Sequence, residues 1–319
     1  MIRRAVISSL VTGLLLAPGL EAKTFTIGTN PQGSLAYSIG SAIAKVLTLQ
    51  TDDRYLVVPR GGPVVTTPLL DKGELDFSIS ASMIPAYAHS GHALFNGSTY
   101  SNIYVVADLI PFQSGVFVKT DSDIRTIGDL KGRKVPTDFK NQSILSDFLN
   151  ATLSTASLTH ADLDGIPTPN GIRGVQDFMA GKTEAAVFSP GAGIVLQADN
   201  AVGGIRYLPI DKTPENEKRV ADLIPGSHIQ TLQPTKSQPG IGPDTHVIAA
   251  SFLLLSSGHV DDATIRTVVE VLHDNKEALV AALGAFRNYE PDHMLRDVKA
   301  PYHPVVTAYF ADREGQPRQ

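Results

Sequence analysis

The 319-residue sequence contains no cysteine and no tryptophan. The absence of cysteine excludes disulfides, thiolate metal sites, iron–sulfur clusters, thiol nucleophiles and lipidation at cysteine. The absence of tryptophan excludes a sugar platform or a cation cage built from indole rings. The sequence also has no basic run: Lys and Arg total 27, Asp and Glu total 32, and the formal net charge is -5. This balance argues against a nucleic-acid partner and against a polybasic membrane surface.

Long hydrophobic runs are missing as well, since no apolar stretch reaches the roughly 20 residues that a membrane-spanning helix needs. The first apolar stretch, residues 5–17, follows Arg3 and Arg4 and ends at Pro18-Gly19. This order is typical of a secretory signal peptide, here expected over residues 1–22. A membrane anchor is the alternative interpretation. We therefore expect a soluble periplasmic protein, and not a lipoprotein because there is no cysteine to carry the lipid.

What the sequence does contain is enough apolar material for a folded core. Hydrophobic residues make up 42% of the chain and charged residues 18%, which argues against disorder. At about 150 residues per domain, the length predicts two domains.

The N-terminal part alternates strand and helix patterns. Strand patterns at 25–28, 56–58 and 75–80 are separated by helical periodicity at 35–47 and 64–70. The order βαβαβ predicts a parallel sheet with right-handed crossovers. In such sheets ligands bind beyond the carboxyl ends of the strands, where loops lead into helix N-termini.

A second unit repeats this order. Its predicted elements are strands at 116–118, 134–135 and 185–188 and helical faces at 144–149 and 172–179. The stretch 179–189 parallels 70–80, because each has a helix end, a glycine and a buried strand that ends at serine. Coincidence is the alternative, because such junctions are common. Two similar lobes facing each other would leave a cleft between them.

A third region closes the chain. An apolar segment at 247–255 is followed by a single long predicted helix whose apolar face includes Ile265 and Leu279. The segment 231–243, rich in Gln, Pro and Gly, is predicted to be the return crossover between the lobes. The expected organisation is lobe I at 23–108 plus 246–319 and lobe II at 109–245, with hinge crossovers near 108–114 and 231–248.

The segment Phe25–Gly40 resembles the signature of the TAXI-type solute-binding proteins of TRAP transporters. In that family a strand ends in Gly-Thr and is followed by a glycine-rich turn, a Tyr and a Gly, as at Gly28-Thr29, Gly33, Tyr37 and Gly40 here. Further similar stretches follow in order at 59–62, 71–82, 129–135 and 301–315.

The resemblance implies a two-lobed α/β fold of the type II periplasmic-binding-protein kind, in which each lobe is a mixed, mostly parallel sheet flanked by helices. It also implies capture of a solute between the lobes by hinge closure, delivery to an integral-membrane TRAP permease, and no cofactor. The sequence departs from the family at Gln32, Pro63, residues 136–143 and Pro304-Val305-Val306. Several of these positions are in loops expected to line the cleft, so the ligand is left open.

The loop after the first strand has the spacing of a phosphate loop, Gly28 to Gly33, but Ser34 stands where a Lys should follow. This argues against a nucleoside triphosphate. The N-terminus of the following helix still suits a carboxylate or another small anion. Arg60 follows the second strand and could clamp a carboxylate with two parallel hydrogen bonds. The alternatives are that Ser34 only caps the helix while Tyr37 packs, and that Arg60 is a solvated surface residue.

The predicted solute site combines these loops with the corresponding turns of the second lobe, which offer amide and hydroxyl groups. Its residues are Thr29, Gly33, Ser34, Tyr37, Arg60, Gly62, Ser80, Ser82, Thr137, Asn141, Gln142, Ser143 and Ser189. The solute expected from this set is a small carboxylate or amino acid.

Two other classes of function remain open. A binding protein of an ABC importer, or a ligand sensor for a membrane kinase, would share the fold. A secreted hydrolase is disfavoured because the sequence has no Gly-x-Ser-x-Gly elbow and no His-Glu-x-x-His motif. His89 and His92 are close in sequence but have no acidic neighbours, so we interpret them as part of an exposed loop and expect neither a catalytic residue nor a metal site.

Overall fold

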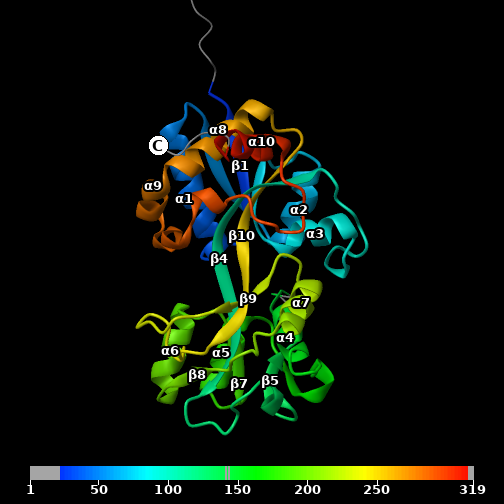
Figure 1. Ribbon diagram of the computed structural model, residues 1–319, viewed down its shortest axis with the longest axis vertical. Coiled ribbons are helices and arrows are strands. Elements are labelled where there is room, and N and C mark those ends of the chain that lie inside the picture. The colour runs from blue at the N-terminus through cyan, green and yellow to red at the C-terminus, as the bar shows by residue number, and fades with distance from the viewer. Residues whose placement is uncertain (1–21, 141, 143, 315–319) are drawn as a thin grey trace, which may run out of the picture.

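Two long antiparallel strands, β4 (Ile103–Lys119) and β10 (His246–Ser257), run from one lobe into the other in the computed structural model (Figure 1). The structure describes residues 22–140, 142 and 144–314. The expected signal peptide therefore lies outside the described residues, except for Ala22.

Lobe I is built on a sheet in the order β2-β1-β3-β10-β4. Its further elements are β1 (Thr24–Thr29), α1 (Leu35–Gln50), β2 (Arg54–Pro59), α2 (Pro63–Asp71), β3 (Phe77–Ala81), α3 (Met83–Ser90) and the 3-10 turn η1 (Ala93–Phe95). β1 pairs in parallel with β2 and β3, as the βαβαβ pattern predicts, and β10 runs antiparallel to β3. The carboxyl ends of β1, β2 and β3 consequently lie at one edge of the sheet.

Helix α1 forms because its buried residues recur on one face. Ile39, Ile43 and Leu47 are fully buried and pack in one cluster with Ile27 and Phe77 of the sheet. Leu35, predicted to share this face, is instead exposed at the first helical position. Leu35 precedes the part of α1 that packs against the core.

Lobe II contains the remaining strands of the eight-stranded sheet and a separate two-stranded sheet. Its elements are η2 (Gly128–Leu130), β5 (Lys134–Thr137), α4 (Ile144–Ser154), η3 (His160–Asp162), β6 (Asp164–Pro167), α5 (Gly171–Met179), β7 (Ala185–Phe188), α6 (Gly193–Val202), β8 (Ile205–Tyr207), α7 (Pro214–Leu223) and β9 (His228–Thr231). β5 pairs in parallel with β6, whereas β7 and β8 run antiparallel to β4 and β9 antiparallel to β10. The predicted α/β architecture with mixed sheets and flanking helices is confirmed. The expectation that the sheets are mostly parallel is wrong: among the strands in the described ranges, three pairs (β1–β2, β1–β3 and β5–β6) are parallel and five are antiparallel.

The chain returns to lobe I through β10 and then forms α8 (Asp262–Asp274), α9 (Lys276–Ala282), η4 (Gly284–Asn288), η5 (Pro291–His293) and α10 (Pro304–Glu314). The single long helix predicted here is therefore wrong. Asn275 leaves the helical conformation at φ -123° and ψ 39°. Its side-chain amide donates to the Val271 carbonyl at 2.9 Å, where the helical backbone would otherwise bond.

The predicted hinge falls on residues 110–114 of β4, which pair with residues 248–252 of β10. On one face of this ribbon the Phe112 ring packs against Phe252 (ring centroids 4.8 Å apart) and against Phe148 of α4 (5.5 Å). The segment 232–245 does not cross between the lobes but bonds within lobe II, for example from Tyr207 N–H to the Gly240 carbonyl. β10 itself makes the return, which differs from the predicted crossover at 231–243.

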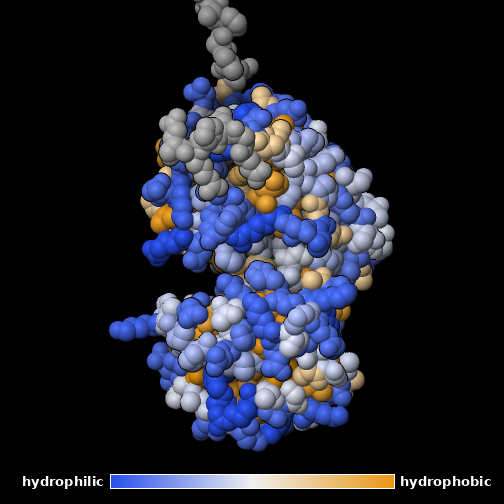
Figure 2. Space-filling view, viewed as in Figure 1, coloured by the Kyte–Doolittle hydropathy of each residue, from blue (hydrophilic) through white to orange (hydrophobic). Residues whose placement is uncertain are grey.

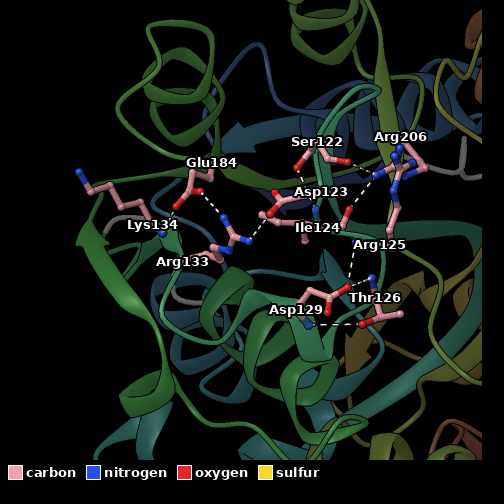
Figure 3. Close-up of polar contacts among 10 residues, drawn as sticks. All are labelled: Ser122, Asp123, Ile124, Arg125, Thr126, Asp129, Arg133, Lys134, Glu184 and Arg206. Atoms are coloured by element: carbon pink, nitrogen blue, oxygen red, sulfur yellow. Dashed lines mark hydrogen bonds and ion pairs between the residues drawn. The ribbon is translucent and has the colours of Figure 1, made fainter.

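The connection from β4 to β5, at the end of lobe II remote from the hinge, is fixed by two arginines (Figures 1 and 3). Arg206 of β8 donates to the carbonyls of Thr120 and Ile124 at 2.6 and 2.7 Å. Arg133 pairs with Asp123 at 2.6 Å and with Glu184 at 3.0 Å. These contacts tie the connection between β4 and β5 to β8 and to the start of β7.

Candidate functional site

Two predicted loops of lobe I lie side by side at the carboxyl edge of the sheet. Thr29 and Pro59 are partners in the β1–β2 register, and Arg60 N–H donates to the Thr29 carbonyl at 2.9 Å. A Cβ on Gly62 would lie 3.3 Å from the Asn30 side-chain oxygen. The structure therefore brings residues 29–34 and 60–62 together.

The N-terminus of α1 opens beside these loops. Ser34 accepts a hydrogen bond from Tyr37 N–H at 3.1 Å, so it is the helix cap that the sequence allows. Among the described residues, the N–H groups of Leu35 and Ala36 have no hydrogen-bond acceptor. Gly33 has φ +90° and open space around it, so the backbone there is accessible to a ligand.

Arg60 is the only cation in these two loops. It is exposed, and no carboxylate among the described residues lies within 4 Å of its guanidinium. The helix N-terminus and this unpaired guanidinium both favour an anion at this edge of lobe I.

The predicted loop of lobe II joins β5 to α4. The Gln142 side-chain oxygen accepts from Gly171 N–H at 3.1 Å, which ties this loop to the start of α5. Asp138 and Phe139 both have positive φ, 67° and 30°. Such conformations cost non-glycine residues about 1–3 kcal/mol and concentrate at ligand-binding sites. Asn141 and Ser143 lie outside the described residues.

Ser189 follows β7 and is half-buried. The preceding residue, Phe188, packs directly on Gly171, because a Cβ there would lie 2.6 Å from two atoms of the Phe188 ring. Buried Thr137 bonds through its carbonyl to Thr168 N–H at 2.9 Å. The ends of β5, β6 and β7 are thus in mutual contact.

The lobes touch each other through helix α3 and the strand end before it. The Ser82 hydroxyl donates to the Gly226 carbonyl of lobe II at 3.3 Å, and the Tyr87 hydroxyl donates to the Leu223 carbonyl at 3.2 Å. Ser82 therefore bridges the lobes. Ser80 is buried in β3, and among the described residues its hydroxyl has no hydrogen-bond partner.

Tyr37 is the predicted residue that lies apart from the others. Its side chain lines a separate depression of about 330 Å³ between α1 and α9, together with Ser41, Lys45 and Leu283. Tyr37 contacts the loop only through its backbone N–H, which donates to the Ser34 hydroxyl.

A larger cavity, of about 520 Å³, lies at the junction of the lobes, and none of the eleven predicted residues that the structure describes lines it. Lobe I contributes Lys276, Arg287, Glu290 and Arg296, and lobe II contributes side chains of β9 and the following loop, including Gln230. This cavity could not be predicted from the sequence, because its basic residues lie in a C-terminal segment without a recognisable motif.

Two titratable groups adjoin this cavity. Burial raises the pKa of the Asp108 carboxyl to about 6, although a Ser251 hydrogen bond and nearby Arg296 oppose the rise. Desolvation lowers the pKa of His228, which lines the cavity, and Arg296 adds to the effect while Glu217 opposes it. Both groups therefore tend toward the neutral form.

The two histidines interpreted as an exposed loop belong to the end of α3 and the cap of η1, which corrects that interpretation. His89 contacts the Ile103 carbonyl, and His92 stacks on Tyr87 at 3.8 Å between ring centroids. Within residues 22–140, 142 and 144–314, no group of three or more potential metal ligands occurs. None of the helices in these ranges has the length and apolar character required to cross a bilayer.

The comparisons with known proteins agree on the architecture. A family model described as the NMT1-like family matches residues 27–313. A TctC solute-binding protein from Polaromonas is 14% identical, with 88% of this chain and 96% of that chain covered and a TM-score of 0.56. The aliphatic sulphonate-binding protein SsuA from Escherichia coli is 17% identical over 91% and 84%, with a TM-score of 0.53.

A third solved structure, a binding-protein component of an ABC phosphonate transporter from Pseudomonas aeruginosa, is 8% identical over 84% and 80%, with a TM-score of 0.52. These likenesses establish the shared two-lobed fold. The matching family model carries the NMT1-like description, so the TAXI resemblance stays a prediction.

Proposed function

Because the chain belongs to the NMT1-like family, we propose that it is an extracytoplasmic solute-binding protein that holds a small anionic solute between its lobes and releases it unaltered. The observation that supports this proposal most directly is that, within each lobe, the loops at the carboxyl ends of the strands lie together. The loops after β1 and β2 of lobe I and the loops after β5, β6 and β7 of lobe II are each gathered at the carboxyl edge of their sheet.

The anionic class follows from the chemistry of these loops. Arg60, Gly33 and the N-terminus of α1 offer positive charge and N–H donors within one surface, and no carboxylate lies within 4 Å of Arg60 among the described residues. A carboxylate, including that of an amino acid, matches this surface, and sulfonate and phosphonate groups share the chemistry. Two solved structures of similar fold are named as an aliphatic sulphonate-binding protein and as a binding-protein component of an ABC phosphonate transporter.

The helices that carry the two N-terminal loops support a shared site. α1 packs in one cluster with Ile110 of the hinge, and α4 packs through Phe148 on Phe112. Ile110 and Phe112 are two residues apart on β4, so they lie on the same face of the hinge ribbon. The solute would then contact both lobes on this face, with residues 29–34 and 60–62 on the lobe I side and residues 137–140, 142 and 189 on the lobe II side.

For delivery, we propose a TRAP-type integral-membrane permease and a periplasmic location, which rest on the TAXI resemblance of residues 25–40. An ABC importer or a sensor kinase is the alternative partner, and one of the similar structures is named as part of an ABC phosphonate transporter. Neighbouring genes that encode a permease with many membrane spans, without a gene for an ATPase, would favour the TRAP-type permease over the ABC importer.

The test is calorimetric titration with a panel of aliphatic carboxylates, amino acids, sulfonates and phosphonates. For any acid that binds, Arg60→Ala should weaken affinity by about 10- to 100-fold, because a hydrogen bond to a charged group contributes about 1.5–3 kcal/mol. Arg54→Ala is the matched control, since Arg54 is exposed at the opposite end of the same strand. Equal affinities in the two variants would rule out this site.

A further inference from the structure

The junction between the lobes has two sides of different character. The cavity of about 520 Å³ lies on one side, where Pro111 and Gln113 of β4 line it. These two residues alternate with Phe112 along the strand, so Phe112 lies on the other side of the β4–β10 ribbon. Figure 2 shows the molecule hollowed between the two lobes on the side where Figure 1 labels α9.

On the Phe112 side the lobes are packed together. Tyr87 of α3 in lobe I and Ile224 of lobe II belong to one cluster of buried apolar residues, and Phe112 packs against that cluster. The Tyr87 hydroxyl also donates to the Leu223 carbonyl of lobe II at 3.2 Å. Separation of the lobes on this side would expose apolar surface to water, so the polar cavity side is the one that opens at lower cost.

On the cavity side, charged groups of lobe I share the cavity with His228 of lobe II. Arg296 pairs with Glu290 at 2.6 Å, and its guanidinium lies 3.9 Å from the buried Asp108 carboxylate. His228 begins β9, lines the cavity and is exposed there, so protons from the solvent reach it.

Further titratable or charged groups surround these residues. Glu290 contacts His293 at 2.6 Å, and Glu217 pairs with Lys212 at 3.7 Å. The remaining groups are Lys276 and Arg287 on the lobe I wall of the cavity and Tyr289 and Tyr302 near Asp108.

Acidification removes negative charge from the lobe I wall. Burial raises the pKa of the Asp108 carboxyl to about 6. The groups packed on Asp108 belong to lobe I: the Met294 carbonyl accepts its backbone N–H at 2.9 Å, and the Ser251 hydroxyl bonds to its carboxylate. Asp108 therefore loses its charge near pH 6 however the lobes are arranged, and the compensation of the Arg296 charge by carboxylates decreases.

Acidification also adds positive charge to the lobe II wall. Desolvation lowers the pKa of His228, and Arg296 and Lys212 add to the effect while Glu217 opposes it. A group whose pKa is lowered in one arrangement binds its proton more tightly in any arrangement that relieves the cause. Protonation of His228 therefore favours a separation of the walls that hydrates the imidazole and takes it away from Arg296.

We propose that His228 and Arg296 form an acid-responsive switch at this junction, which separates the two lobes on the cavity side as the pH falls. Protonated His228 faces the cations of the lobe I wall, and like charges repel across the gap. The packed Phe112 side keeps its contacts and becomes the axis of the motion. This regulation goes beyond the proposed function, because it acts on the lobes whether or not a solute is bound.

The test is a distance measurement between spin labels on Ala281→Cys of α9 and Gln197→Cys of α6, one in each lobe. Both residues are exposed, neither lines the cavity, and the chain has no cysteine of its own. We expect the ratio of the longer to the shorter distance population to rise about 3-fold or more between about pH 7.5 and about pH 5, as one exposed pair of like charges implies. In salt of about 1 M, where the screening length is about 3 Å, the rise should shrink.

Two variants and a second measurement identify the groups responsible. In His228→Gln the ratio of the two populations should be the same at both pH values. His160→Gln is the matched control, because His160 belongs to the same lobe and does not line the cavity, and it should respond like the unmodified protein. In an NMR titration, Arg296→Gln should raise the pKa of His228.

Three results would overturn the proposal. They are a distance distribution that does not change with pH, a pH response that persists in His228→Gln, and a His228 pKa that Arg296→Gln leaves unchanged. All these measurements are made without added solute, so none of these results bears on solute binding at Arg60.

Discussion

The contact between Ser82 and Gly226 allows the two lobes to be locked covalently. A Cβ built on Gly226 lies 3.3 Å from the Ser82 Cβ, close to the roughly 3.5–4.5 Å that disulfides require. The chain has no cysteine of its own, so Ser82→Cys/Gly226→Cys introduces a single pair. We expect this pair to oxidise readily in the folded protein.

The magnitude follows from the separation of the two residues along the chain, which is 144 positions. Closing a loop of that size reduces the entropy of the unfolded chain by about 5 kcal/mol. Against this, Gly226 has φ +75°, a conformation that costs a cysteine about 1–2 kcal/mol, and the Ser82 hydroxyl bond contributes about 1 kcal/mol. The oxidised variant should therefore be about 2–3 kcal/mol more stable than the unmodified protein.

The assay is urea unfolding of the oxidised and reduced variant, combined with a thiol count by a colorimetric reagent. The reduced variant should be about 2–3 kcal/mol less stable than the unmodified protein, and the single variants Gly226→Cys and Ser82→Cys should lose about 1–2 and about 1 kcal/mol. Two freely reactive thiols in the folded, air-oxidised variant would show that the lobes are not in contact at this point. That result would contradict the contact between Ser82 of lobe I and Gly226 of lobe II.

Three further predictions concern stability. Gly171→Ala should lower the free energy of unfolding by about 1–3 kcal/mol, because the new Cβ meets three side-chain atoms at 2.6 Å. Gly193→Ala is the control and should change the free energy of unfolding little, because its new Cβ meets nothing within 4 Å. Equal urea midpoints for the two variants would contradict this difference. The Asp261 carboxylate accepts a hydrogen bond from Thr264 N–H, the largest of several contacts that lower its pKa to about 2. The stabilisation of the fold by this carboxylate is therefore present above about pH 4 and is lost as the pH falls toward 2. Asp261→Asn should flatten the decline of stability at acid pH. Burial raises the pKa of Asp108 to about 6, so stability should decline as the pH rises through 6; a decline that persists unchanged in Asp108→Asn would refute that assignment.

The helices and the parallel strands of lobe I could be predicted from periodicity because each has one buried face. α1 is the clearest case, with Ile39, Ile43 and Leu47 at helical spacing. Strand β4 was recognised only at 116–118, because its hinge portion contains Asp108, Pro111 and Gln113, which resemble a loop. The strand tolerates these polar residues because this part of it lies between the two lobes.

The break between α8 and α9 escaped prediction for a related reason. Leu272 and Leu279 are both fully buried, so the apolar period continues across Asn275 although the backbone does not. At the exposed end of α5, Ile172 was predicted to share the buried face with Val175 and Phe178, and it is exposed instead. It lies in the first turn, beyond the reach of the core.

Of the predicted site, the loops after β1, β2 and β5 followed from topology alone, since parallel strands end at a common edge. The cations at Lys276 and Arg287 could not be found in this way. Lys276 begins the short helix α9 and Arg287 lies in η4, neither of them within a motif, and only the folded chain places them across from Gln230 of lobe II. The Ser82 and Tyr87 contacts to lobe II are likewise products of tertiary packing.

The most direct measurement is equilibrium dialysis of the protein against the acid panel, followed by NMR identification of the solute recovered from the bound fraction. We expect one solute per chain, bound in the loops around Arg60 and recovered chemically unchanged, and we expect Arg60→Ala to lose it and Arg54→Ala to retain it. Recovery of a converted product, or retention of the solute by Arg60→Ala at full affinity, would contradict it.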